Sequence, residues 1–289
     1  MSLDAFLQAA WAEHADHPQV VADRLAASVH LVQLPADVRP FAGLVAHVYG
    51  EHLGQWQQGI AVLDLVRRAP GFDGSTAADE PLARWIATLR YAGGDAAALQ
   101  PLPVQERVAV LANAAAMFAG QHDFRGAIGA YREALRLAEG GLPAGSPAIR
   151  SLAVAGNNLA VALEARATLD AAEREGMLVA AQGGLAYWKQ AGTWLEKERA
   201  EYRLSRSLQK AGEAEAAIGA AQRCIEICRR NEAPAFEMFF ACAVLALAHR
   251  QAGNADAFVA QRDLALEAYT RLPEDEKTWC EKDRAELLA

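Results

Sequence analysis

The sequence has little of several features that would assign it to a large class of proteins. It has 4 cysteines among 289 residues, and they lie inside helical patterns rather than in loops, as free thiols of a reducing compartment do. Its longest apolar runs, such as Met238–Ala248, are shorter than the roughly 18 residues that span a membrane. Met1-Ser2-Leu3-Asp4 lacks the basic start and apolar core of a secretory signal. We therefore expect a cytoplasmic protein.

Positive charge is also scarce. The chain has 28 Lys and Arg against 36 Asp and Glu, which gives a formal net charge of −8. Such a balance disfavours general attraction to nucleic acid and to anionic membranes, and no segment has the basic excess of a nucleic-acid-binding module. We expect neither nucleic acid nor membrane among the partners.

Motifs of enzymes are missing as well. There is no Gly-x-Ser-x-Gly, no phosphate loop and no dinucleotide fingerprint. Cys224 and Cys228 lie one helical turn apart, but no histidine at ligand spacing completes a metal site, and Cys224 occupies a packing position. We expect no enzyme, no catalytic residue and no cofactor.

The histidines form two small groups in the sequence. His47, Glu51 and His52 make a polar cluster without the His-Glu-x-x-His arrangement, and His14 and His17 straddle a turn. Neither group alone has the spacing of a zinc site, so the sequence predicts no metal.

The chain is rich in residues that favour helices, and it repeats a helical hairpin. Ala, Leu, Glu, Arg and Gln dominate, with few β-branched runs. The clearest copy of the hairpin covers residues 204–225, and related copies cover 114–135 and 245–266. Each copy has small residues where two helices approach, and a single hairpin cannot bury its apolar face alone. Stacked neighbours must therefore supply the core.

The spacing of the copies is similar to that of a known family of helical repeats. Equivalent positions of the first helices are His47, Ala87, Ala115, Ala160, Ser205 and Ala246, at intervals of 40, 28, 45, 45 and 41 residues. With the Asn-Asn-Leu-Ala run at 157–160, this pattern resembles the longer tetratricopeptide (TPR) repeats of kinesin light chains and of bacterial regulatory proteins. The resemblance implies an all-α, αα-hairpin solenoid wound as a right-handed superhelix. Another kind of αα array is the alternative architecture.

Glycine and proline divide the chain into four predicted parts. We expect N-terminal hairpins over 1–70 and an irregular linker with a truncated hairpin, and a kink, over 71–103. The TPR-like array is expected over 104–271 and a polar capping helix over 272–289.

A basic stripe is the strongest functional signal. Arg199, Arg203, Arg206 and Lys210 have offsets that place them on one face of one helix. In the TPR family such first helices line a concave groove, so the stripe predicts a site for acidic groups. The alternative is an ordinary solvated face with local ion pairs.

Asparagines extend the predicted groove. Asn113 and Asn158 occupy equivalent places in successive first helices, and Asn157 adjoins the second. In the family such amides hold the backbone of a bound peptide, because an amide both donates and accepts. The alternative is that they are ordinary residues of the repeat. Asn158, Arg199 and Arg203 match three of five positions of the family's carboxylate clamp, whereas Ala112 and Ala116 replace the other two.

The sequence thus predicts a protein- or peptide-binding scaffold for an extended acidic or carboxylate-terminated segment. One alternative is a regulatory or sensory module that binds a small ligand or signalling peptide. Another is self-association into a homo-oligomer through a patch at Phe236, Phe239 and Phe240.

Overall fold

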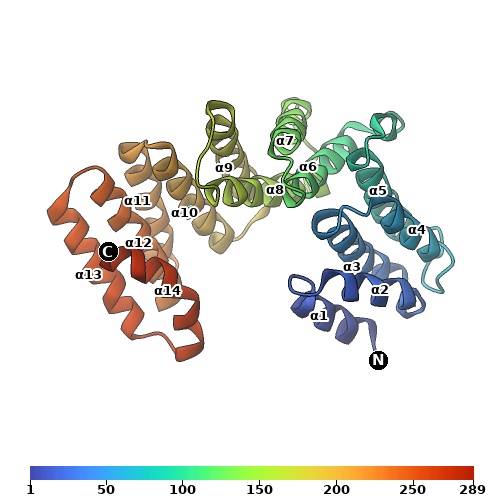
Figure 1. Ribbon diagram of the computed structural model, residues 1–289, viewed down its shortest axis with the longest axis horizontal. Coiled ribbons are helices and arrows are strands. Elements are labelled where there is room, and N and C mark those ends of the chain that lie inside the picture. The colour runs from blue at the N-terminus through green and yellow to red at the C-terminus, as the bar shows by residue number, and fades with distance from the viewer. The chain divides into compact units, whose positions relative to one another are not determined.

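The computed structural model describes residues 1–289, and every regular element in it is helical. Fourteen α-helices follow one another with no strand (Figure 1). The predicted all-α, αα-hairpin fold class is confirmed. No helix combines the length and apolar character needed to cross a membrane.

Two compact units divide the chain, Met1–Ala155 and Gly156–Ala289. The first unit contains α1 (Leu3–Glu13), α2 (Pro18–Ala27), α3 (Pro35–Ala46), α4 (Trp56–Val66), α5 (Thr76–Ala92), α6 (Val104–Gly120) and α7 (Phe124–Ala138). It also has short 3₁₀ turns at Val29–Leu31 and Ala96–Leu99 and a π-helical turn, η2, at His47–His52. Helix α8 (Pro147–Glu164) begins in this unit and continues into the second.

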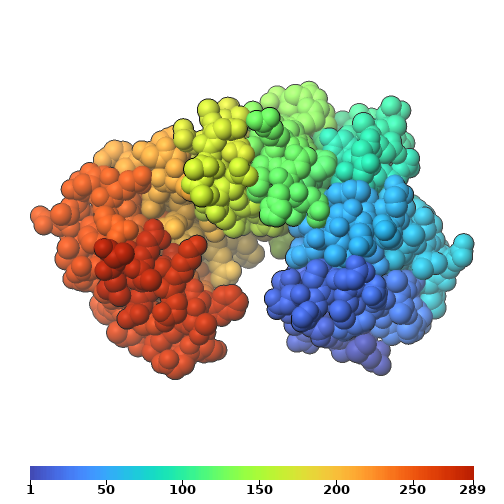
Figure 2. All heavy atoms as spheres, in the orientation of Figure 1, coloured from blue at the N-terminus to red at the C-terminus, as the bar shows by residue number.

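The second unit continues the hairpin pattern. It contains α9 (Ala171–Ala191), α10 (Trp194–Ala211), α11 (Ala214–Arg230), α12 (Ala235–Gln251), α13 (Ala255–Thr270) and α14 (Glu274–Leu288). Helix α10 pairs with α11, α12 pairs with α13, and α14 packs on both α12 and α13. The atoms of this C-terminal part form a continuous surface in the space-filling view (Figure 2, orange to red).

Side-chain hydrogen bonds cap the first turns of helices α10 and α8. The Thr193 side chain accepts from Leu195 N at 3.3 Å, and the Glu196 carboxylate accepts from Thr193 N at 2.8 Å, so a capping box forms. At the start of α8, the Ser146 hydroxyl accepts from Ala148 N at 3.3 Å. These bonds satisfy donors that the first helical turn leaves without partners.

Small residues bring the paired helices together. Ala115, Ala160, Ser205 and Ala246, which the spacing aligned, are all 0% exposed. The Ser205 hydroxyl is satisfied by donating to Ala217 O at 2.9 Å across the hairpin. The repeat therefore places these small side chains inside the packed hairpins.

The region 71–103 differs from the prediction. Helix α5 begins at Thr76, inside the stretch that was expected to be irregular, and it packs against α3, α4 and α6. The apolar core of the first unit runs from Leu3 to Met117 and includes Leu82 and Leu89 of α5. The boundary between units lies inside α8 instead. The Gly- and Asp-rich stretch before α5 predicted an irregular segment, but the apolar residues of α5 pack into the core and stabilise a regular helix.

Candidate functional site

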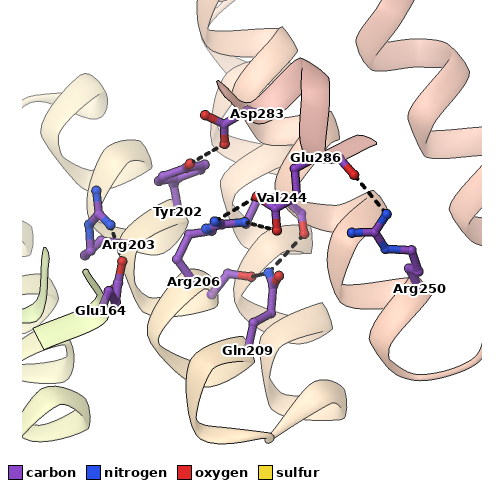
Figure 3. A network of polar contacts seen from close by, with 10 residues as sticks. Glu164, Tyr202, Arg203, Arg206, Gln209, Val244, Arg250, Asp283 and Glu286 are labelled. Carbon is purple, nitrogen blue, oxygen red and sulfur yellow. Dashed lines mark hydrogen bonds and ion pairs between the residues drawn. The ribbon is translucent and has the colours of Figure 1, made fainter. Parts of the chain in front are cut away.

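The predicted basic stripe on α10 does not present four free cations. Arg199 pairs with Glu237 at 2.6 Å, Arg206 pairs with Glu286 at 3.0 Å, and Arg203 pairs with Glu164. Lys210 Nζ donates to the carbonyl of Arg166 at 2.6 Å. Figure 3 shows the network around Arg203 and Arg206, in which Tyr202 also donates to Asp283 at 2.9 Å.

This network corrects the interpretation of the stripe as a free attractor for acidic groups. The arginines connect α10 to α8, α12 and α14, and Arg203 and Arg206 are only 22% and 21% exposed. The alternative in the sequence was a solvated face with local ion pairs, whereas the partners of these arginines lie 38 to 80 residues away in the sequence. The partial match to a carboxylate clamp is not assembled, because Arg199 and Arg203 already hold intrachain carboxylates.

The predicted asparagines have different surroundings. Asn113 is half-buried and lines a hollow of the first unit, and no group of the chain bonds to its amide. Asn157 is half-buried and lines a hollow of the second unit, while Asn158 is exposed and accepts from Asn157 Nδ2 at 3.3 Å. Asn113 therefore keeps its full capacity to donate and accept.

The hollow of the first unit has a volume of about 670 Å³ and is lined mainly by the first helices of successive hairpins. Trp11 comes from α1, Trp85 from α5 and Asn113 from α6, with α3 and the start of α8 completing the wall. The Trp85 indole lies beside Gly43 of α3, where a Cβ would make an ordinary contact at 3.8 Å from Trp85 Nε1. Trp11 is 46% exposed, so the hollow offers an accessible aromatic surface.

The charge of this hollow has one sign. Arg39, Arg84 and Arg150 line it, and no Asp or Glu does. Arg84 forms a bidentate pair with Glu106 at 2.6 and 2.8 Å, outside the lining, whereas Arg39 is exposed and forms no ion pair. Arg39 therefore gives the rim of this hollow a positive charge in a protein of net charge −8. The sequence did not reveal it, because its arginines lie on three helices.

The hollow of the second unit is smaller, about 430 Å³, and of mixed charge. Asn157, Arg199 and Arg203 line it together with Glu198 and Glu237. Its aromatic residues are Tyr202, Phe236, Phe240 and Trp279. Arg206 and Lys210 line a separate hollow of about 330 Å³ that also contains Glu164 and Glu286.

The apolar patch predicted for self-association is not assembled as expected. Phe239 is 0% exposed, and Phe236 and Phe240 are half-buried against it and each other, with ring centroids 5.1 Å apart. The exposed aromatic residue of this region is Trp279 of α14, at 76%.

All four cysteines are free and buried, in agreement with their positions inside helical patterns. A hydrogen bond with Cys228 and burial raise the pKa of Cys224, and burial raises the pKa of Cys242 to about 11. Because the thiolate is the reactive form, the thiols of Cys224 and Cys242 are unreactive at neutral pH.

A buried carboxyl group lies beside Cys224. Glu198 is 1% exposed and accepts from Cys224 Sγ at 2.9 Å, while its Oε2 has no partner. Burial and the nearby charge of Glu237 raise its pKa to about 7. Glu198 is therefore protonated over a wider pH range than an exposed glutamate.

Three histidines that are far apart in the sequence meet in the first unit. His14, at the end of α1, joins His47 and His52 of η2, and one ligand atom of each lies within 4.8 Å of the others. In the sequence these histidines fall into two separate groups, because α1 and η2 meet only in the folded unit.

Comparison with known proteins identifies the fold. No family model and no curated protein sequence matches the chain. Among solved structures, the nearly identical TPR-like repeats of a kinesin-light-chain-type protein from Podospora anserina superpose with a TM-score of 0.50 at 14% identity, covering 81% of this chain and 95% of that one. The chain has a TPR-like fold. A point variant of the same protein gives a TM-score of 0.50 at 14% identity, covering 82% and 96%.

This TPR-like likeness agrees with the resemblance that the repeat spacing indicated. At this level of identity it establishes the arrangement of helical hairpins, and the site must be argued from the side chains themselves.

Proposed function

We propose that the protein is a non-catalytic scaffold that binds another protein, and that an extended acidic segment of this partner lies in the hollow of the first unit. The observation that carries the proposal is the lining of that hollow, which has no carboxylate and includes Arg39, an exposed arginine without an ion pair. Charge complementarity selects an acidic occupant and speeds its association.

The polar and aromatic groups of the hollow suit an extended chain. The amide of Asn113 can donate to a backbone carbonyl and accept from a backbone N–H. Trp11 and Trp85 supply rigid aromatic surface, which anchors binding at many protein interfaces. A segment with acidic residues next to apolar ones would meet both kinds of group.

The hollow of the second unit is a secondary part of the proposal. Asn157, Arg199 and Arg203 line it, but Glu198 and Glu237 share it. The side chain of Arg199 is 56% exposed although it pairs with Glu237, so it can still contact a ligand at the rim of the hollow. Buried thiols suit function in the cytoplasm.

Site-specific photo-crosslinking tests the main proposal. A photoreactive residue at Ser151, in the lining, should capture a protein from native lysate, and mass spectrometry of the crosslinked peptide should show an acidic segment. The matched control is the same photoreactive residue at Gly129, on the exposed face of α7, where a Cβ meets nothing within 4 Å.

A charge reversal then tests the role of the arginines. Arg39→Glu should weaken binding of a synthetic peptide of the captured segment by about 3- to 10-fold in fluorescence anisotropy, because an attractive contact becomes repulsive. A basic or neutral segment, equal capture from Gly129, or unchanged affinity of the variant would contradict the proposal. If small metabolites of the lysate prevented the crosslink from forming, that result would instead support a ligand-sensing module.

A further inference from the structure

The histidine trio of the first unit owes its geometry to the π-helical turn. In a regular α-helix each residue advances by about 100°, so side chains five residues apart point about 140° away from each other. The turn His47–His52 closes with Leu53 N donating to Val48 O at 3.1 Å, five residues back. This wider turn brings His47 and His52 onto one face, with ring centroids 4.8 Å apart.

The rest of the unit holds this turn in place. Gln121 Nε2 donates to Glu51 O at 2.8 Å and lies 3.4 Å from Gly50 O. Gly120 fits against the same backbone, where a Cβ would lie 2.4 Å from Glu51 O. Packing of α6 therefore fixes the positions of His47 and His52 without help from a bound ion.

The third histidine lies at the end of α1. His14 ends that helix, and its ring lies 4.9 Å from His47 and 5.0 Å from His52, centroid to centroid. All three residues are half-buried, so solvent can reach the nitrogens while the surroundings restrict the rings.

Outer hydrogen bonds select the nitrogens that face the centre of the trio. His14 Nδ1 lies 2.7 Å from Trp11 O, and His47 Nδ1 lies 3.0 Å from Glu51 Oε1. A carbonyl or carboxylate oxygen only accepts, so both Nδ1 atoms carry the proton and both Nε2 atoms keep a lone pair. Such partners are typical of histidines that bind metals.

The third ring completes the arrangement. His52 Nε2 lies 3.2 Å from His47 Nε2, so in the ion-free trio His52 donates its proton to that lone pair. Two nitrogens bound to one tetrahedral zinc ion are about 3.3 Å apart. The His47–His52 pair is already close to this separation. Because the three ligand atoms lie within 4.8 Å of one another, a shift of about 1.5 Å at most brings the third nitrogen to it.

We propose that His14, His47 and His52 bind one divalent transition-metal ion of the zinc class. Imidazole nitrogens suit such ions, and three histidines leave a fourth position open to water. When the ion binds, the proton on His52 Nε2 moves to its Nδ1, so that all three rings stay neutral. Glu51 is a positioning residue that orients His47.

The site adjoins the proposed groove. The Trp11 ring is 5.0 Å from the rings of both His14 and His47, and Trp11 also lines the hollow. A bound ion would fix α1 against η2 and hold Trp11 in one orientation. The metal site stands on its own residues, and it holds whether or not the groove binds an acidic segment.

Calorimetric titration of the chelator-treated full chain with Zn²⁺ tests the proposal. One ion per chain should bind, and His14→Ala or His52→Ala should weaken binding at least 100-fold. Glu51→Gln should weaken it about tenfold, as loss of an outer partner does. The matched control is His17→Ala, three residues beyond His14 on an exposed turn, which should leave the affinity unchanged.

A second readout reports the coordination directly. Co²⁺ in place of Zn²⁺ should give the visible absorption bands of a four-coordinate ion, and His14→Ala should abolish them while far-ultraviolet circular dichroism stays unchanged. Failure of the wild-type chain to bind Zn²⁺, binding undiminished in the His14 and His52 variants, or equal loss in the His17 variant would overturn the proposal.

Discussion

At the scale of single residues, burial decides which charged groups act on stability and which remain for ligands. Glu164, Glu198 and Glu237 are nearly buried, and two of them neutralise arginines of α10. Arg39 remains exposed and unpaired. Arginines of α10 thus stabilise helix packing in the second unit, whereas Arg39 of the first unit keeps a positive charge that a ligand can contact.

Glu198 gives a pH-dependent prediction at this scale. Its pKa rises from about 4.5 to about 7 on folding, so the unfolded chain releases the proton at lower pH than the folded chain. Stability should therefore fall as pH rises from about 4.5 to about 7 and then level off. Glu198→Gln removes this loss, because the amide stays neutral.

Urea unfolding measures the effect. At pH 8 the Glu198→Gln variant should be more stable than the wild type by roughly 2–3 kcal/mol, and near pH 4.5 the difference should be small. Glu215→Gln, on the exposed face of α11, should change stability by less than about 0.5 kcal/mol at both pH values. A Glu198 variant less stable at pH 8 would show that the carboxylate form is needed.

At the scale of elements, glycines set how closely η2 and α6 approach. Gly120→Ala should destabilise the protein by about 1–3 kcal/mol, since the new Cβ would overlap Glu51 O at 2.4 Å and neither backbone can yield freely. Thermal melting followed by circular dichroism measures the loss.

Gly129→Ala is the matched control for this element. Its position in α7 has the same helical backbone but nothing within 4 Å of the Cβ. Alanine there should be neutral or stabilise by up to about 1 kcal/mol, because it lowers the entropy of the unfolded chain. Opposite signs at the two glycines are the expected result, and equal melting temperatures would show that α6 can move away from η2.

At the scale of the whole molecule, an array of hairpins needs a covering element at its end. Helix α14 buries Cys280 and Leu287, and Asp283 and Glu286 bond to Tyr202 and Arg206 of α10. A chain that ends at Leu272 would expose that surface and leave Arg206 without its partner.

This truncation should lower the melting temperature and increase binding of a hydrophobic dye. Trp279→Ala is the control, because that side chain is 76% exposed and should change stability by about 0.5 kcal/mol or less. A truncated chain as stable as the full one would show that α14 is not a stabilising cap.

The sequence by itself determined the repeating helical hairpins, because they follow from local patterns. The small residues at Ala115, Ala160, Ser205 and Ala246, and the capping box at Thr193, act between near neighbours or at fixed spacing. It also placed the buried thiols, since their positions follow the same helical period.

Only the tertiary structure decided the charges and the sites. The partners of Arg199, Arg203 and Arg206 lie 38 to 80 residues away, so the sequence could not show that the stripe is neutralised. The arginines of the first hollow and the three histidines likewise come from separate helices. Local sequence governs hydrogen bonds along one helix, whereas electrostatic and ligand geometry depend on distances between helices that only packing sets.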